Sequence, residues 1–285
     1  MKHLFLKCSS YSTFFFILVT AGVNAVTSVH AFSPAVIFDN GLFFDPFEYL
    51  NLPQTKHRAE LAKAFDSTVL IGGRATAVMV SPHGVMLTAF HTIRDLYVGP
   101  TDQCQKLNFF MGHRREADGS TDSQLRRFDC AKILFTDYAS DFAVIQAKLP
   151  VGETVPYAEV ETRESEIAIG MTGIVSGHRK GATFPDSYQR ISSGEVIQYY
   201  PHHEELPHFL HQIDTEGGDS GAPIFNTQGK LIGIHFRGIP NYGHDVPVVI
   251  GGKPALSHRF NVAIPLPYLA GKFGKEFLQN PVQNR

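Results

Sequence analysis

The sequence predicts an all-β fold in two halves, followed by a C-terminal helix. From Ser67 onward, short apolar runs rich in β-branched residues alternate with turns of Gly, Pro, Asn and Asp. Many such runs at fairly even spacing are typical of a β-barrel or a β-sandwich. A turn at residues 149–152 divides them into two groups. After them, apolar residues recur at helical spacing, which predicts a closing amphipathic helix: Leu266, Leu269, Phe273 and Phe277.

The expected strands can be followed along each half of the chain. We predict residues 67–150 as the first β-half and residues 151–285 as the second half with its helix. The first-half strands are expected at 68–71, 76–80, 84–87, 107–111, 131–135 and 142–146. The second-half strands are expected at 166–175, 193–198, 209–213, 222–225, 230–235, 246–250 and 261–264.

The N-terminus has the pattern of a secretory signal peptide. Lysines precede a short apolar core at residues 14–19, and small residues permit cleavage after Ala25 or as late as Ala31. An uncleaved anchor is the alternative. Residues 26–66 are expected to be either a pro-segment or an N-terminal arm. We therefore predict a protein that is secreted or periplasmic.

Charge and cysteine content narrow the class of protein further. The formal net charge of −2 comes without a long run of one sign, which argues against nucleic acid or an anionic membrane as the main partner. Cys8 leaves with the leader, so Cys104 and Cys130 remain as an even pair in an oxidising compartment. They flank a polar stretch at 116–123 that resembles a hairpin loop. We predict a disulfide between them, with a free thiol as the alternative.

The strongest chemical motif is Thr215-Glu-Gly-Gly-Asp-Ser-Gly-Ala-Pro223. A nucleophilic serine needs a tight turn, with free backbone N–H groups directed at the oxygen that becomes negative. The glycines permit such a turn. Ser220 is therefore the candidate nucleophile, and the N–H groups of Gly218 and Ser220 are the candidate oxyanion hole. The alternative is a glycine-rich surface turn.

A serine nucleophile also needs a base and an orienting carboxylate. His91 follows an expected strand and a turn of small residues, a rigid position for an imidazole. Asp141 opens an apolar strand, where a carboxylate is costly to bury unless it has a partner such as an imidazole N–H. Asp137 is the alternative carboxylate.

These motifs, in the order Leu-Thr-Ala-x-His, Asp-x-Ala-Val and Gly-Asp-Ser-Gly-x-Pro, resemble the trypsin-like serine peptidases. The resemblance runs from about residue 68 to residue 267. It implies two six-stranded barrels with His91 and Asp141 from the first and Ser220 from the second, acting as base, orienting carboxylate and nucleophile. The activation sequence Ile-Val-Gly-Gly is missing at a suitable distance before His91, and the cysteines do not flank that histidine. Both departures indicate the bacterial branch.

Within that branch the chain is similar to the glutamyl endopeptidases, which bind an acidic side chain with a hydroxyl and a histidine. The resemblance implies Thr215 and His235 as substrate-binding residues. Arg237 is a further candidate, for which a solvated side chain is the favoured interpretation. If His235 acts as an imidazolium, binding should weaken as pH rises. Asp214 keeps open an alternative pocket for Lys or Arg, and a hydrogen-bonded strand residue is the alternative role for His235.

The remaining expectations concern metals, partners and rival functions. The histidines of the stretch 201–211 lack a recognised zinc spacing, so we expect no metal and no cofactor. Protein or peptide substrates are the expected partners of a monomeric enzyme. An inactive protease-like binding protein is the rival from another class, and an active protease of other specificity is the rival within this one.

Overall fold

The computed structural model describes residues 43–96, 104, 106–179, 187–203, 206–240, 246–250, 253–257 and 259–274. The expected signal peptide lies outside these residues and stays a prediction. None of the described helices combines the length and the apolarity needed to cross a bilayer.

The first half of the chain forms a closed six-stranded antiparallel barrel, in the order β1-β2-β3-β6-β5-β4. Its strands are β1 (Thr68–Ile71), β2 (Ala75–Met79), β3 (Val85–Ala89), β4 (Asn108–Met111), β5 (Arg126–Asp137) and β6 (Phe142–Lys148). Buried side chains from alternate positions of these strands fill the barrel, among them Val69, Met86, Phe109 and Ile145. Closure pairs every strand edge, as an all-β domain of this size requires.

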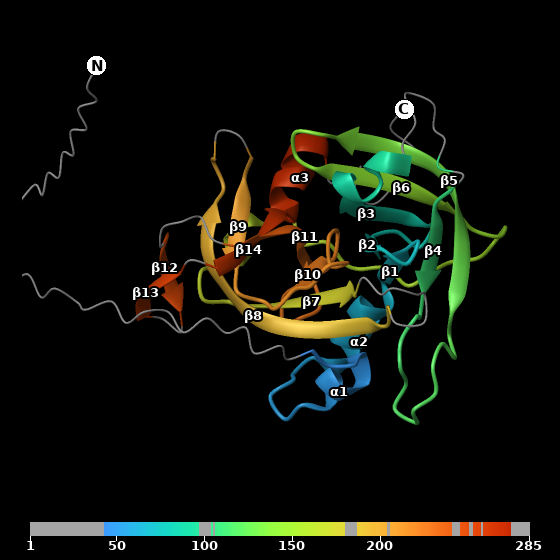
Figure 1. Ribbon diagram of the computed structural model, residues 1–285, viewed down its shortest axis with the longest axis horizontal. Coiled ribbons are helices and arrows are strands. Elements are labelled where there is room, and N and C mark those ends of the chain that lie inside the picture. The colour runs from blue at the N-terminus through green and yellow to red at the C-terminus, as the bar shows by residue number, and fades with distance from the viewer. Residues whose placement is uncertain are drawn as a thin grey trace, which may run out of the picture. The chain divides into compact units, whose positions relative to one another are not determined.

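The second half forms another closed six-stranded antiparallel barrel, in the order β10-β11-β14-β9-β8-β7. Its strands are β7 (Thr172–His178), β8 (Gln189–Tyr200), β9 (His208–His211), β10 (Pro223–Phe225), β11 (Leu231–Pro240) and β14 (Arg259–Pro265). Strands β12 (Val246–Ile250) and β13 (Lys253–Ser257) form a separate two-stranded sheet. The helix α3 (Leu266–Phe273) follows β14 directly. Figure 1 shows the two barrels with α3 beside them. The predicted all-β fold of two six-stranded barrels with a C-terminal helix is confirmed.

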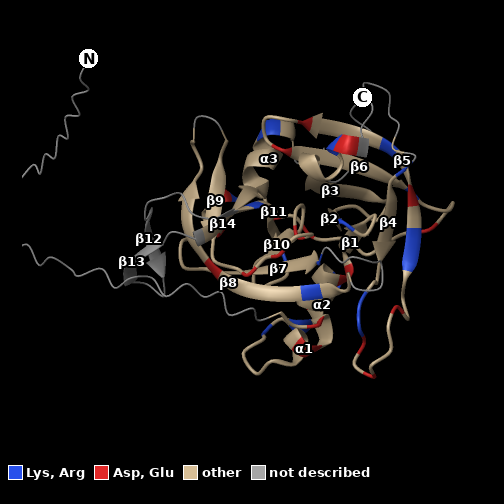
Figure 2. Cartoon of the chain, in the orientation of Figure 1, with Lys and Arg blue, Asp and Glu red and all other residues tan. Residues whose placement is uncertain are grey.

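Several strand boundaries differ from the prediction. The strand expected from residue 166 begins only at Thr172, because residues Glu164–Glu166 form a 3-10 turn and Gly170 has a φ of 84° that breaks the extended run. Strand β5 is much longer than 131–135, because exposed Arg127 and Asp129 flank buried Phe128 in the alternation of an extended strand. Both charge signs lie along it in Figure 2. Strand β12 was expected within the barrel series, yet among the described strands it pairs with β13 alone.

Two short helices precede the first barrel and pack on the second one. These are α1 (Pro46–Asn51) and α2 (Arg58–Asp66). Phe44 pairs with Ile191 of β8 through two backbone hydrogen bonds of 2.9 and 2.8 Å. Phe65 is 1% exposed and packs between Tyr49, which it meets edge to face, and the tilted ring of Phe225, with ring centroids 5.9 and 6.3 Å away. The buried side chains of residues 43–66 therefore belong to the hydrophobic cluster that also contains residues of both barrels and of helix α3.

Candidate active site

His91 sits on a 3-10 turn at the end of strand β3. The turn spans Phe90–Thr92, and the hydroxyl of Thr92 donates to the carbonyl of Ala89 at 2.7 Å. Ile93 is fully buried and anchors the far side of the turn. The imidazole itself is 41% exposed, so it can meet a molecule from solution.

Asp141 holds this imidazole by two hydrogen bonds. Its Oδ2 lies 2.6 Å from His91 Nδ1, and its Oδ1 accepts the backbone N–H of His91 at 2.8 Å. A carboxylate can only accept here, so His91 carries its proton on Nδ1 and presents Nε2 as a free base. The structure thus joins the predicted base to the predicted orienting carboxylate.

Asp137, the alternative carboxylate, lies at the other end of the same turn and has other partners. It accepts from Lys272 Nζ, from the hydroxyl of Ser140 at 2.8 Å and from the N–H of Ala139 at 3.0 Å. Burial raises the pKa of Asp137, but the bonds from Lys272 and Ser140 outweigh that effect and lower the pKa overall. Asp141, and not Asp137, is therefore the partner of His91.

Ser220 lies on a turn in which most of the neighbouring backbone N–H groups donate to backbone carbonyls. Asp219, Gly221 and Ala222 donate to the carbonyls of Glu216, His235 and Asp219 at 3.1, 2.7 and 2.8 Å. Within the described part of the chain, no hydrogen bond uses the N–H of Gly218 or Ser220. Gly218 has a φ of 112°, a conformation that other residues rarely adopt. These two free donors are what an oxyanion hole requires.

Thr76 of the first barrel forms hydrogen bonds with the serine turn of the second barrel. Its N–H donates to the carbonyl of Ser220 at 3.1 Å, and its hydroxyl donates to the carbonyl of Gly218 at 2.9 Å. The turn also lies directly on strand β3, since a Cβ at Gly221 would fall 2.1 Å from Thr88 Oγ1 and 3.0 Å from Ala89 N. The role of Thr76 was not predicted from the sequence, because a threonine inside a strand carries no distinctive signal.

These contacts place the serine turn against Ala89, the last residue of β3, which precedes His91 by two residues in the chain. No hydrogen bond joins Ser220 to His91 among the described residues. Such bonds are often long in unliganded enzymes and tighten only when substrate binds. The structure places the three predicted residues at one junction between the barrels.

His235, on strand β11, forms a buried pair with His211 of β9. The N–H of Ile213 donates to His211 Nδ1 at 3.3 Å, and His211 Nε2 lies 3.3 Å from His235 Nδ1. Because a backbone N–H only donates, a neutral His211 carries its proton on Nε2 and donates to His235. A neutral His235 then carries its own proton on Nε2. The contact of His211 with His235 was not predicted from the sequence, where His211 was weighed only as a metal ligand.

Burial decides the charge of these two histidines. Burial, with a smaller effect from the nearby His91, lowers the pKa of His235 to about 3. Burial likewise lowers the pKa of His211 well below its usual range. At neutral pH the free protein therefore holds His235 as a neutral imidazole and not as the imidazolium considered from the sequence. Thr215 lies half-buried in the segment that precedes the serine turn.

Arg237 and Asp219 are further charged residues near this site. The guanidinium of Arg237 lies over the ring of Phe236 at 5.3 Å, and the residue is exposed, as its strand position suggests. Asp219 is buried, and its Oδ2 accepts the N–H of Glu216 at 2.7 Å. Burial raises the pKa of Asp219 to about 7.

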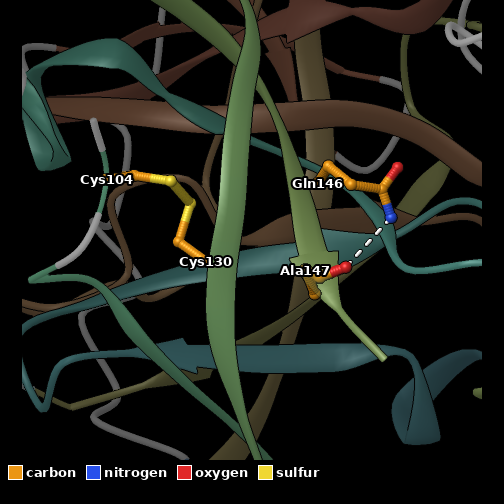
Figure 3. Close-up of a disulfide and its surroundings, with 4 residues drawn as sticks. All are labelled: Cys104, Cys130, Gln146 and Ala147. Atoms are coloured by element: carbon orange, nitrogen blue, oxygen red, sulfur yellow. Dashed lines mark hydrogen bonds between the residues drawn. A yellow bond between two sulfur atoms is a disulfide. The ribbon is translucent and has the colours of Figure 1, made fainter. Parts of the chain in front are cut away.

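The disulfide involves Cys130 of strand β5, and His208 lies on strand β9. The structure contains the predicted disulfide between Cys104 and Cys130, with the Cα atoms 5.6 Å apart, beside Ala147 of β6 (Figure 3). His208 Nδ1 donates to the carbonyl of Leu206 at 2.7 Å. Across the described residues, His, Cys, Asp and Glu form no group of three or more that could hold a metal.

Comparison with protein families gives the site its context. A model of the trypsin-like peptidase domain matches residues 75–234, which is more than half of the chain and includes His91, Asp141 and Ser220. The chain belongs to the trypsin-like peptidase family. Glutamyl endopeptidase of Staphylococcus aureus strain MW2 is 31% identical over 96 residues, covering 32% of this chain and 25% of that protein. The chain thus matches about a quarter of this relative's length.

Solved structures support the same fold at low sequence identity. Deg5 superimposes with a TM-score of 0.54 at 16% identity, covering 80% of this chain and 94% of that one. The MamO protease domain of Magnetospirillum magneticum gives a TM-score of 0.50 at 15% identity, covering 74% and 97%. At such identities the two likenesses concern the fold alone.

Proposed function

We propose that this trypsin-like peptidase is a secreted serine endopeptidase that uses His91, Asp141 and Ser220 as its catalytic triad. The observation that carries the proposal is the arrangement of side chains where the two barrels meet. A histidine fixed on Nδ1 by a carboxylate lies beside a serine turn with two unused N–H donors. An acyl-transfer site needs a base, a nucleophile and an oxyanion hole in such an arrangement.

The reaction follows from the tautomer of His91. Ser220 Oγ attacks the scissile carbonyl carbon while its proton passes to His91 Nε2, and the N–H groups of Gly218 and Ser220 receive the oxyanion. The protonated His91 then gives that proton to the leaving amine. Water repeats the two steps on the acyl-enzyme. Asp141 keeps the ring oriented and stabilises the charged imidazole throughout.

We further propose a preference for Glu, and more weakly Asp, before the scissile bond. The support is the direction of the hydrogen bonds from Ile213 through His211 to His235, which leaves a proton on His235 Nε2. A neutral N–H donor, helped by the Thr215 hydroxyl, suits a carboxylate acceptor, and bonds to charged acceptors are the stronger ones. The partial similarity to a glutamyl endopeptidase agrees with this preference. The disulfide and the leader-like N-terminus support export from the cytoplasm.

Labelling with a fluorophosphonate tests the triad against the rival of an inactive binding protein. The wild-type protein should react at Ser220, and Ser220→Ala should not. Loss of the nucleophile should lower turnover of a peptide substrate by about 10⁶-fold. Ser220 is only partly exposed, and removing one hydroxyl leaves little cavity, so the variant should unfold at an unchanged temperature. A tenth of the wild-type activity in Ser220→Ala would refute the mechanism.

Matched peptides that differ only in the residue before the scissile bond test the specificity. We expect kcat/KM for Glu to exceed that for Gln by roughly tenfold and that for Lys by much more, because the charge-assisted bond is lost. Asp should fall between Glu and Gln, since its shorter side chain reaches His235 less well. Equal rates for Glu and Gln would refute charge recognition while leaving the peptidase activity standing. Faster cleavage after Lys would instead favour Asp214 as the pocket residue.

A further inference from the structure

The orienting carboxylate sits on strained backbone. Asp141 has a φ of 49°, in the left-handed region that residues other than glycine seldom adopt. Strain of this kind persists only when the surrounding structure fixes it. The turn between β5 and β6 must therefore be held from outside if the Asp141 carboxylate is to stay on His91.

Asp137 organises this turn from its first residue. Its Oδ1 accepts the N–H groups of Ala139 and Ser140 at 3.0 and 3.3 Å, and its Oδ2 accepts the hydroxyl of Ser140 at 2.8 Å. Ser140 directly precedes Asp141 and is 1% exposed. The Asp137 side chain, which is 15% exposed, thus fixes the residues on which the conformation of Asp141 depends.

Lys272 of helix α3 reaches the same turn from the far end of the chain. Its ammonium donates to Asp137 Oδ2 and to Ser140 Oγ, the latter at 3.1 Å. The neighbouring ring of Phe273 packs on Phe135 and Phe142, with centroids 4.6 and 6.0 Å away. Helix α3 follows the last strand of the second barrel, yet it contacts both first-barrel strands that flank the turn.

We propose that Lys272 and Asp137 are positioning residues that hold the Asp141 carboxylate on His91. Among the described residues no polar contact joins Lys272 to His91, so its effect passes through Asp137, Ser140 and the backbone of Asp141. The proposal rests on the proposed peptidase function. It assigns to helix α3, which follows the second barrel in the chain, the role of aligning the base of the first barrel.

The test compares Lys272→Met, which keeps the aliphatic stem, with Lys272→Arg, which keeps the charge. Lys63→Met is the matched control, because Lys63 pairs with Glu159 at 3.4 Å on an exposed surface. We expect Lys272→Met to lower kcat by about tenfold or more with KM within about twofold, because a small misplacement of a catalytic group acts on the chemical step. Lys272→Arg should restore most of kcat, and Lys63→Met should change neither constant.

A second measurement separates positioning from stability. The Nδ1 proton of His91, bonded to Asp141, should give a downfield proton resonance in the intact protein. We expect Lys272→Met and Asp137→Asn to broaden or shift it, and Lys63→Met to leave it unchanged. An unchanged resonance and kcat in Lys272→Met, or an equal loss in Lys63→Met, would overturn the proposal. A wild-type protein that hydrolyses nothing would refute the peptidase function, while the resonance would still test the positioning.

Discussion

Two histidines at the candidate pocket act as one unit. His235 can offer an N–H to a substrate only if its proton is on Nε2, and His211 enforces that tautomer by donating to Nδ1. A glutamine at position 211 carries a donor close to the position of the imidazole Nε2–H, whereas a leucine carries none. The identity of residue 211 should therefore affect substrate choice without touching the triad.

We predict that His211→Leu lowers the Glu-to-Gln ratio of kcat/KM by about tenfold, because His235 becomes free to adopt the other tautomer. His211→Gln should keep most of the ratio. His208→Gln, on the same strand, is the control and should keep all of it. Steady-state kinetics on the matched peptide pair give the answer. An intact ratio in His211→Leu would show that the tautomer is set elsewhere.

Among the individual site residues, those that belong to recognisable motifs were predicted from the sequence. Asp141 and His91 meet as expected because each stands in a distinctive strand-end context. Thr76, His211 and Lys272 were not predicted, since each is an ordinary strand or helix residue until the barrels bring it to the site. The neutral charge of His235 also depends on burial, which no local pattern reveals.

The strands and helices were largely predictable where the apolar pattern is regular. Strands β1, β2, β3 and β6 lie close to their expected positions, because their burial is nearly continuous. Strand β5 was shortened in the prediction because the charged residues Arg126, Arg127 and Asp129 interrupt the apolar pattern of its first half. The partnership of β12 with β13 could not be predicted, since strand pairing depends on long-range contacts.

We predict that the N-terminal helices contribute to the stability of the fold. Phe65→Ala should lower the free energy of unfolding by about 3–5 kcal/mol, because it empties a fully buried site between Tyr49 and Phe225. Ile169→Ala, at a side chain 45% exposed, is the control and should change it little. Urea unfolding measures both. A small loss in Phe65→Ala would mean that residues 43–66 are dispensable, as a removable pro-segment would be.

At the scale of the whole molecule, polar side chains are buried where the two barrels meet. Thr68 Oγ1 and Ser176 Oγ lie 2.7 Å apart, and Gln189 Nε2 donates to the same Ser176 oxygen at 2.8 Å. The ring of His178 stacks near that of His113, with centroids 6.2 Å apart. His178 Nδ1 donates to the carbonyl of Ser187, while its Nε2 is buried without a partner among the described residues. Protonation of that atom would leave a buried charge.

This arrangement predicts that the protein loses stability in mild acid. Burial lowers the pKa of His178 to about 3, as it does for His235, and lowers that of His211 as well. Each of these histidines binds a proton more readily when unfolded, so its contribution is complete above about pH 6.5 and is lost as pH falls. Asp219, with a pKa raised to about 7, acts in the opposite direction, because the folded state holds its proton. Taken by themselves, these three histidines and one carboxylate bind about two more protons in the unfolded chain than in the folded protein between about pH 6 and pH 4.5.

The free energy of unfolding should therefore fall by about 2–3 kcal/mol for each pH unit over that range, at about 1.4 kcal/mol per proton. His178→Asn keeps a donor for the Ser187 carbonyl but cannot titrate, so its slope should be smaller by about one proton. His83→Asn, at an exposed histidine, is the matched control and should leave the slope unchanged. Urea titrations on the Ser220→Ala background, which avoids self-digestion, measure all three slopes. A slope in His178→Asn equal to that of its parent would show that the interface between the barrels opens to solvent before it takes up a proton.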